Sequence, residues 1–384
     1  MKILHVIPSL RKGGAERLCL DTVEALRKLP GVEAADVAVL ENVNEYDGEY
    51  PDIKPLPVAS KVVPSLSGKW TVDLREWDAL TDRYRPDVIH THLFAADLLA
   101  RYRPLPGVKY LSHCHDNMHQ LSRLTPSGWF SKKRITEWYE RRFMLDRYAR
   151  SANTFLAISR DTEAYFRKNL PPALAARVKY LPNAIDVARF SAHSAQYVPD
   201  TVLRLINIGS FTPKKNQAFL VKVLARLIAE GTDATLTFAG EGPLKTETER
   251  LAKEYGLEHR TVFPGRTSDI ERQLWQHHVY VHGATYEPFG LVLLEAMAAG
   301  LPVVCVDGKG NRGLVDDGIN GYMVEAGDIR TFTECVRRVT AGPEEWERMS
   351  RAAGQKAGEF DIKKYVETLS AVYREAPEAL PQSR

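Results

Sequence analysis

Short apolar runs rich in β-branched residues alternate along the chain with longer segments in which apolar residues recur every three or four positions. This alternation is typical of parallel strands covered by helices. The pattern predicts strands at residues 2–8, 35–41, 87–92, 108–114, 154–159, 203–209, 234–240, 261–265, 279–284 and 302–307. Helices are expected between the strands, including residues 15–29 and 133–152.

The alternation stops over residues 181–200, which are loop-rich and without sustained periodicity, and then restarts. A chain of 384 residues is too long for one ordinary core, so two domains are expected. We predict two doubly wound α/β domains, residues 1–185 and 186–357. The amphipathic pattern of residues 361–374 predicts a last helix, but it does not decide which domain the helix covers.

Composition limits the class of protein. The apolar fraction of 44% and charged fraction of 26% are those of a soluble globular protein, and a net charge of +3 gives no case for a nucleic-acid partner. The four cysteines form no C-x-x-C pair, so neither a zinc site nor a disulfide framework is indicated. The N-terminal apolar stretch is too short for a signal peptide, and no run approaches the ~20 apolar residues of a membrane span. A cytoplasmic protein is expected.

The segment "EPFGLVLLEAMAAG", residues 287–300, contains the most informative charged residues of the chain. Glu295 stands in an otherwise uncharged run, and burying an unpaired carboxylate costs several kcal/mol. Gly290 opens a predicted helix whose first N–H groups, those of Leu291 and Val292, have no partner within the helix. Together with the helix dipole they form an anion site that suits a phosphate or diphosphate.

Two carboxylates flank this predicted anion site. Glu295 lies about one turn into the helix, where it can reach a ribose diol beyond the phosphate. Glu287 lies before the turn, on the side of whatever hangs from the distal phosphate. The alternative is that Glu295 pairs with a basic residue such as Arg312 and that Glu287 lies on the surface.

Two further loops can bring positive potential or backbone to an anion. Gly13 and Gly14 stand between the first strand and the first helix and permit close backbone approach, although an ordinary tight turn explains them equally well. They do not form G-x-G-x-x-G, so no dinucleotide cofactor is indicated. Lys214 and Lys215 follow the strand at 203–209; either can reach an anion, and the alternative is a pair of surface lysines.

Histidines gather at the ends of two neighbouring strands. Strand alternation sends His113 and His115 to one face, and His90 and His92 form a similar pair on the preceding strand. Ligands bind at this end of α/β sheets. A polar lining with one working histidine and a metal site made from the four are both consistent with the pattern.

Three other segments remain, and two of them leave two interpretations each. Residues 238–247 form a Gly-rich turn expected to face a ligand cleft, and residues 307–322 are a glycine-rich loop that either surrounds a polar ligand or makes no contact at all. Residues 129–150 interleave basic residues with Trp129, Phe130, Trp138 and Tyr139. That pattern fits a core-packed helix, with contact to an anionic membrane surface as the alternative.

Taken in order, these segments resemble one family. The motifs "SLRKGGAE", "LSHCHD", "LAIS", "LPNAID", "GSFTPKKN", "FAGEGP", "FPG" and "EPFGLVLLEAMAAGLPVV" occur in the order seen in retaining GT-B glycosyltransferases of family GT4. The resemblance covers nearly the whole chain. It implies two Rossmann-like domains facing across a cleft, residues 1–185 for the acceptor and 186–357 for the nucleotide-sugar donor. It also implies that the last helix, within residues 358–384, crosses back to the N-terminal domain.

The resemblance assigns roles position by position. It implies that Glu287 holds the hydroxyls of the donor sugar and that Glu295 binds the ribose. Lys215 would neutralise the departing phosphate, and His115 would lie beside the C6 hydroxyl and the reacting centre. Asn183 matches the asparagine of an interdomain loop in the family.

The diphosphate would be held by backbone from two places, the Gly13–Gly14 loop and the residues after Gly290. Ser210 belongs to this phosphate-binding set but departs from the family, which usually has arginine there, five residues before the lysine. Half of the usual basic clamp is therefore missing, and Arg312, Arg266 and Lys214 are the candidate substitutes.

The expected activity is retaining sugar transfer on the front face of the donor, from a nucleoside diphosphate sugar to a glycan or lipid-linked acceptor of cell-surface polysaccharide synthesis. UDP is the favoured base and GDP-mannose the next. No metal or other cofactor is expected, and peripheral contact with the inner membrane face is compatible with the basic–aromatic segment. The alternatives are a UDP-sugar epimerase of the same fold and a non-catalytic nucleotide-sugar-binding homologue.

Overall fold

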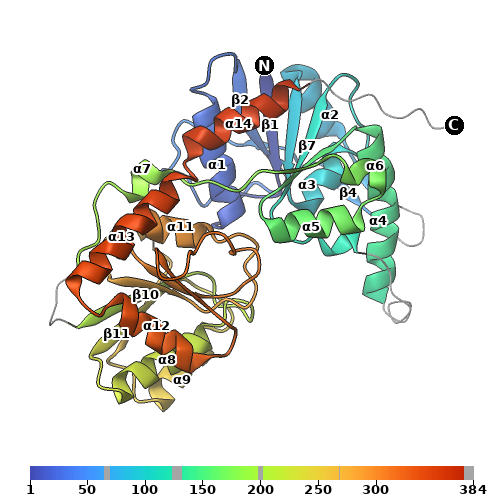
Figure 1. The fold of residues 1–384 in the computed structure, drawn as a ribbon. Coiled ribbons are helices and arrows are strands. Elements are labelled where there is room, and N and C mark those ends of the chain that lie inside the picture. The colour runs from blue at the N-terminus through green and yellow to red at the C-terminus, as the bar shows by residue number, and fades with distance from the viewer. Residues whose placement is uncertain (65–69, 123–131, 198–201, 268, 376–384) are drawn as a thin grey trace. The chain divides into compact units, whose positions relative to one another are not determined.

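The computed structural model describes residues 1–64, 70–122, 132–197, 202–267 and 269–375 (Figure 1). The chain forms two compact units, which are considered one at a time. The first unit contains Met1–Asn183 and Ile362–Arg384, and the second contains Ala184–Asp361.

The first unit is built on a seven-stranded parallel sheet in the order β3-β2-β1-β6-β7-β8-β9. Its strands are β1 (Lys2–Ile7), β2 (Ala34–Val39), β3 (Leu56–Pro57), β6 (Val88–His92), β7 (Lys109–Cys114), β8 (Thr154–Ala157) and β9 (Val178–Tyr180). A separate antiparallel pair joins β4 (Lys61–Val63) and β5 (Thr71–Asp73). The five strands predicted in this half are present. The four that were not predicted have two or three residues each, too few to show a period.

Helices cover this sheet (Figure 1). They are α1 (Gly14–Leu26), α2 (Arg75–Tyr84), α3 (Leu93–Ala100), η1 (His119–Leu121), α4 (Lys132–Arg150), α5 (Arg160–Asn169), α6 (Pro172–Ala175) and α14 (Ile362–Arg374). The last of these, α14, packs against α1. Its C-terminal end is tied to the unit because Arg374 donates to the carbonyl of Pro30 at 3.0 Å. Tyr373, near the end of α14, is buried, and its hydroxyl lies in the interior of this unit.

Helix α4 is the basic–aromatic segment, and its apolar side packs within the unit. Met144 and Tyr148 are fully buried, and the Phe143 ring lies 4.3 Å from that of Trp70. Trp70 also donates to the hydroxyl of Tyr139 at 2.9 Å. The contacts support the packed-helix interpretation; Trp129 and Phe130 lie outside the described residues. In the described part of the chain no helix is long and apolar enough to cross a bilayer.

The second unit has a six-stranded parallel sheet in the order β12-β11-β10-β13-β14-β15. Its strands are β10 (Leu203–Ile208), β11 (Ala234–Ala239), β12 (Thr261–Gly265), β13 (Val279–His282), β14 (Val303–Val306) and β15 (Gly321–Val324). Its helices are α7 (Val187–Phe190), α8 (Gln217–Ala229), α9 (Lys245–Glu254), α10 (Ile270–Trp275), α11 (Leu291–Ala298), α12 (Ile329–Val339) and α13 (Pro343–Gly358). All strands predicted here are present, and β15 is the addition.

The order of both sheets creates a switch point, where neighbouring strands send their connections in opposite directions. In the first unit it lies between β1 and β6, and in the second between β10 and β13. Ligands of open α/β sheets bind outside the carboxyl ends of the strands at such points. The residues that follow these strands are therefore the ones to inspect.

Candidate active site

In the second unit, the loops after β10 and β13 bring together a lysine and a glutamate that are far apart in sequence. Lys215 Nζ lies 2.5 Å from Oε2 of Glu287, and the two side chains are only 15% and 9% exposed. The Lys215 amide bonds the carbonyl of Thr212 at 3.0 Å, in a turn that ends at Asn216, whose φ of +51° begins α8. Neither residue lies free on the surface, so the surface alternatives for Glu287 and Lys215 are wrong.

His282, the last residue of β13, is the third member of this group. Its Nε2 lies 3.0 Å from the same Oε2 of Glu287, and its Nδ1 lies 3.3 Å from the hydroxyl of Tyr280. Burial lowers the pKa of His282 although the carboxylate beside it acts the other way. The ring is therefore neutral and donates from Nε2 to Glu287, while the Tyr280 hydroxyl beside Nδ1 also donates to the Ile208 carbonyl at 3.2 Å.

Glu287 is ionised in spite of its burial. Burial alone would raise its pKa, but the Lys215 ammonium and the His282 hydrogen bond more than offset this and hold the pKa at about 2. Both contacts fall on Oε2. Oε1 takes no hydrogen bond from any residue that the structure describes, so it is available to a ligand hydroxyl.

The glycine-rich loop after β14 packs against the backbone of Glu287. The amide of Glu287 donates to the carbonyl of Gly308 at 2.9 Å. A Cβ at Gly310 would lie 2.1 Å from the carbonyl oxygen of Pro288, so only glycine fits there. Asn311 is fully buried and accepts from the Gly308 amide at 2.9 Å. The loop therefore packs on the backbone that carries Glu287, and its contact with a ligand stays a prediction.

Helix α11 is buried except along one narrow, partly exposed face. Gly290, at φ +106°, begins it, and the first intrahelical bond runs from the amide of Leu293 to the Gly290 carbonyl at 3.0 Å. The amides of Leu291 and Val292 precede that bond. Leu291, Val292 and Glu295 are its three partly exposed residues, whereas Leu293, Leu294, Ala296, Met297 and Ala298 are buried. Helical spacing thus places the free amides and the Glu295 carboxylate on one side.

Ser210, which stands where the family usually has arginine, and the three basic residues that could replace that arginine differ in their surroundings. Ser210 is exposed in the loop after β10, where its carbonyl accepts from the Gln217 side chain at 3.2 Å. Lys214 and Arg266 are also exposed. Arg312 forms a two-pronged ion pair with Asp307, at 2.6 and 2.9 Å. Arg312 therefore already has a strong anionic partner.

In the first unit, the carboxyl edge of the sheet is lined by histidines. The rings of His113 and His115 are stacked, with centroids 4.2 Å apart and planes within 7°. His90 stacks on His113 at 5.3 Å, and His92 on His115 at 5.1 Å. His5 of β1 completes the group, 2.9 Å from His92 between ring nitrogens. Thus the four predicted histidines do lie together.

Burial dominates the ionisation of this group. It lowers the pKa of His5 to about 3, with the neighbouring His113 acting in the same direction. It lowers the pKa of His113 to about 4, and it also places those of His90, His92 and His115 well below the ordinary value. The rings are neutral near pH 7, so this edge offers hydrogen bonds rather than charge.

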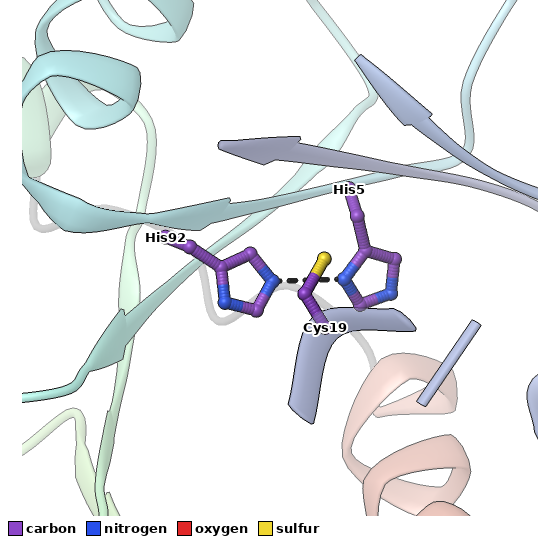
Figure 2. A group of neighbouring side chains, drawn as sticks. All are labelled: His5, Cys19 and His92. Atoms are coloured by element: carbon purple, nitrogen blue, oxygen red, sulfur yellow. Dashed lines mark hydrogen bonds between the residues drawn. The ribbon is translucent and has the colours of Figure 1, made fainter. Parts of the chain in front are cut away.

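Two sets of side chains in the described residues could hold a metal ion: His5 with Cys19 and His92 (Figure 2), and His92 with His113 and His115. In each set the ligand atoms lie within 4.8 Å of one another. The ring nitrogens of His5 and His92 that face each other are already joined by a hydrogen bond. A metal would have to displace the shared proton. The absence of a metal requirement is not tested by this geometry and stays a prediction.

The Gly13–Gly14 loop begins α1, and its surroundings were not anticipated. The Tyr46 hydroxyl donates to the carbonyl of Gly13 at 2.9 Å. A Cβ on Gly13 would lie 2.4 Å from Oε2 of Glu16, so a carboxylate from the first turn of α1 lies over this loop. Burial raises the pKa of Glu16, partly offset by a hydrogen bond to its own backbone. A phosphate bound here would have to displace or neutralise Glu16.

Comparison with known proteins places these two halves in one family. The model described as Glycosyltransferase Family 4 matches residues 12–189, and that described as Glycosyl transferases group 1 matches residues 191–356. A glycogen synthase of Mycobacterium tuberculosis (strain H37Rv) is 30% identical over 316 residues, which are 79% of this chain and 73% of that protein. The chain belongs to glycosyltransferase family 4.

Two further likenesses agree with this family. An Escherichia coli UDP-Gal:alpha-D-GlcNAc-diphosphoundecaprenol alpha-1,3-galactosyltransferase is 23% identical over 360 residues, 88% of each chain. The crystal structure of Anabaena Alr3699/HepE in complex with UDP and glucose has a TM-score of 0.75 at 19% identity, covering 98% of this glycosyltransferase and 100% of that chain. The fold is therefore GT-B, as predicted.

Four residues of this glycosyltransferase that shape the two edges were not anticipated from sequence: His282, Asn311, His5 and Tyr373. His282 lies in a predicted strand that precedes the segment with two glutamates, which was a usable signal. His5 lies within the first predicted strand, where nothing in the local pattern marks its contact with His92. Asn311 and Tyr373 act through partners that only the tertiary structure reveals.

Proposed function

We propose that this glycosyltransferase transfers a sugar, with retention of configuration, from a nucleoside diphosphate sugar to a glycan or lipid-linked acceptor in cell-surface polysaccharide synthesis. UDP is the favoured nucleotide. The observation that carries the donor assignment is the partly exposed face of α11, where the amides of Leu291 and Val292 and the carboxylate of Glu295 lie together on a helix that is otherwise buried.

The chemistry of that face matches a nucleoside diphosphate. Free amides at a helix N-terminus, with the positive end of the dipole, suit the diphosphate. Glu295, one turn further along, would accept hydrogen bonds from the ribose diol. The UDP in the structure of Alr3699/HepE and the UDP-galactose in the name of the E. coli relative support uracil as the base.

Lys215 and Glu287 would act at the other end of the donor. We assign Oε1 of Glu287 to the sugar hydroxyls because Oε2 is occupied by Lys215 and His282. As the bond to the sugar breaks, the Lys215 ammonium would stabilise the charge that develops on the departing phosphate. Because Lys215 and the helix N-terminus supply this positive potential, the proposal includes no metal.

The first unit would contribute His115, beside the C6 hydroxyl of the donor sugar, and the Gly13–Gly14 backbone. No carboxylate of the described site is assigned as a nucleophile. The proposed reaction proceeds on the front face, with the departing phosphate accepting the proton of the attacking hydroxyl. The lipid-linked acceptor in the name of the E. coli relative supports an acceptor of that class, and with it a location at the inner membrane face.

The experiment that tests this proposal has two stages. Thermal shifts with UDP, GDP, ADP and TDP identify the base, since a ligand at a hundred times its Kd stabilises the native state by ~2.7 kcal/mol. The matching sugar nucleotides are then tested with lipid-linked glycan acceptors, and NMR of the product reads the anomeric configuration.

Stabilisation by UDP and a product with the anomeric configuration of the donor are expected. Stabilisation by GDP alone would contradict the choice of base, and an inverted product would contradict the mechanism. Release of an epimerised sugar nucleotide without acceptor would contradict transfer itself.

A further inference from the structure

Three histidines of the first unit form a continuous hydrogen-bonded chain that ends at His115. His5 Nδ1 lies 2.9 Å from His92 Nε2 (Figure 2), and His92 Nδ1 lies 2.8 Å from His115 Nε2. His5 and His92 are buried, at 0% and 1% exposure, whereas His115 is partly exposed. The chain therefore runs from the interior of the sheet to a ring that a ligand can reach.

Each ring in the chain carries one proton. Burial disfavours the charged form of all three, and among the described residues no carboxylate is hydrogen-bonded to any of them. A neutral imidazole has one nitrogen that donates and one that accepts, and the partner of one nitrogen decides which is which. The state of His115 is thus tied to that of His92.

Counting protons leaves two arrangements of the chain. Each of the two ring-to-ring bonds holds one proton, because two would clash and none would leave facing lone pairs. The third proton must then stand at one end, either on Nε2 of His5 or on Nδ1 of His115. In the first arrangement His115 offers a lone pair from Nδ1, and in the second it offers an N–H.

The inner end of the chain decides between these arrangements. The Tyr373 hydroxyl lies 2.7 Å from Nδ1 of His90 and 3.4 Å from Nε2 of His5, and it has one proton to donate. If it donated to His90, the proton of that ring would be on Nε2, which is buried without a partner. Among backbone groups, buried N–H groups without a partner are rarer than buried acceptors without one, and we expect the same of ring nitrogens. His90 therefore donates to Tyr373, and Tyr373 donates to His5.

His113 follows the same rule. Its Nε2 lies 2.9 Å from Oδ1 of Asn183 and donates to it, and the buried nitrogen without a partner, Nδ1, is an acceptor. In both His90 and His113 the proton goes to the nitrogen that has a partner. By the same rule, the hydrogen bonds of the chain are donated in one direction. Tyr373 donates to His5, His5 to His92, and His92 to His115.

We propose that His5 and His92 are positioning residues that hold His115 in its Nδ1–H tautomer, so that it presents an N–H donor to the ligand. Nδ1 of His115 bonds no described residue, so the donor is free. An N–H suits a hydroxyl oxygen or an anionic phosphate oxygen, and it prevents this nitrogen from acting as a base. The effect on transfer rests on the proposed function, whereas the tautomer does not.

The test is 15N NMR of the full chain with labelled histidine, without substrate, to locate the ring protons. The wild-type protein is expected to show Nδ1–H on His115 and Nδ1–H on His92. In His92→Phe the chain is broken, and His115 is expected to populate both tautomers. His92→Gln, whose amide N–H replaces the donated proton, is expected to retain the wild-type tautomer. Tyr365→Phe removes a buried hydroxyl of α14 that has no partner and serves as control.

A proton on Nε2 of His115 in the wild-type protein overturns the proposal, whether or not the variants fold. An unchanged tautomer in His92→Phe overturns it as well. With a donor and acceptor in hand, His92→Phe should lower kcat by roughly tenfold to a hundredfold, the size of one hydrogen bond to a charged group, with less change in KM. Absence of transfer by the wild-type protein would defeat the proposed function and leave the tautomer assignment standing.

Discussion

The carboxyl edges of the two sheets solve the problem of buried polar side chains in opposite ways. In the second unit, Lys215 and Glu287 are both charged and are held 2.5 Å apart, with His282 as a neutral third partner. In the first unit, burial keeps five histidines neutral; His5, His92 and His115 hydrogen-bond one another, whereas His90 and His113 bond Tyr373 and Asn183. The charged edge of the second unit suits binding and stabilising a charged group, whereas the neutral edge of the first unit suits orientation of a ligand.

The largest expected effect concerns the charged edge. Lys215→Ala should lower kcat of sugar transfer by about 10²–10³-fold, the loss seen when one donor that stabilises a developing negative charge is removed. Lys214→Ala, which changes the exposed neighbour, should have little effect. Steady-state kinetics with the cognate donor measure both. Equal losses in the two variants would mean that the second unit acts by general positive potential rather than through the ion pair.

The neutral edge predicts a dependence of stability on pH. The folded pKa of His5 is about 3 and that of His113 about 4, both below the unfolded value near 6.5. Below pH 6.5 the unfolded chain binds more protons, so the free energy of unfolding falls as the pH is lowered. Each such histidine contributes up to about 1.4 kcal/mol per pH unit until its folded pKa is reached.

Urea unfolding between pH 7 and pH 5 tests this, with hydrogen exchange to follow each unit. His5→Asn should reduce the slope for the first unit and leave that of the second unchanged. An equal slope in the wild-type protein and the variant would contradict the neutral state of the histidine.

A smaller effect is expected for the carboxylate on α11. Glu295→Ala should weaken UDP binding by about three- to tenfold, the contribution of one or two hydrogen bonds. Glu344→Ala, an exposed glutamate in the first turn of α13, is the matched control. Isothermal titration with UDP measures both affinities. If Glu295→Ala binds UDP as tightly as the wild-type protein, the ribose assignment is wrong.

The smallest effect is expected at the N-terminus of α1. Because Glu16 lies over Gly13, it opposes any phosphate at that loop. Removing its charge in Glu16→Gln should tighten UDP binding by roughly two- to fivefold, the usual size of a charge at a helix terminus. Glu24→Gln changes an exposed glutamate of the same helix and should leave the affinity unchanged. Weaker binding in Glu16→Gln would mean that Glu16 contacts the donor itself.

Much of the fold was predictable because long, β-branched strands have a clear local signal, and β10, a mostly buried run of six residues, is an example. The edge strand β15 was missed because it begins at Gly321, whose Cβ would lie 2.0 Å from the carbonyl oxygen of Val303. Glycine is unfavourable in strands by local propensity, and only the close approach of β14 explains its presence.

Of the candidate site, too, one part was predictable from the sequence and another was not. Glu295 and the helix after Gly290 were predictable because charge, capping and period all lie within one segment. The pairing of Lys215 with Glu287 was not, because 72 residues separate them and only the order of β10 and β13 joins them. The chain from Tyr373 to His115 depends on a contact between the last helix and the first strand, which no local pattern encodes.

In the proposed function, the diphosphate of the donor binds at the N-terminus of α11. The most direct measurement follows the backbone amide signals of Leu291 and Val292 in labelled protein while UDP or uridine is added. We expect UDP to shift both amide signals strongly and uridine, which lacks the diphosphate, to leave them in place. Saturable binding of UDP that leaves both amides unchanged would contradict this placement of the diphosphate.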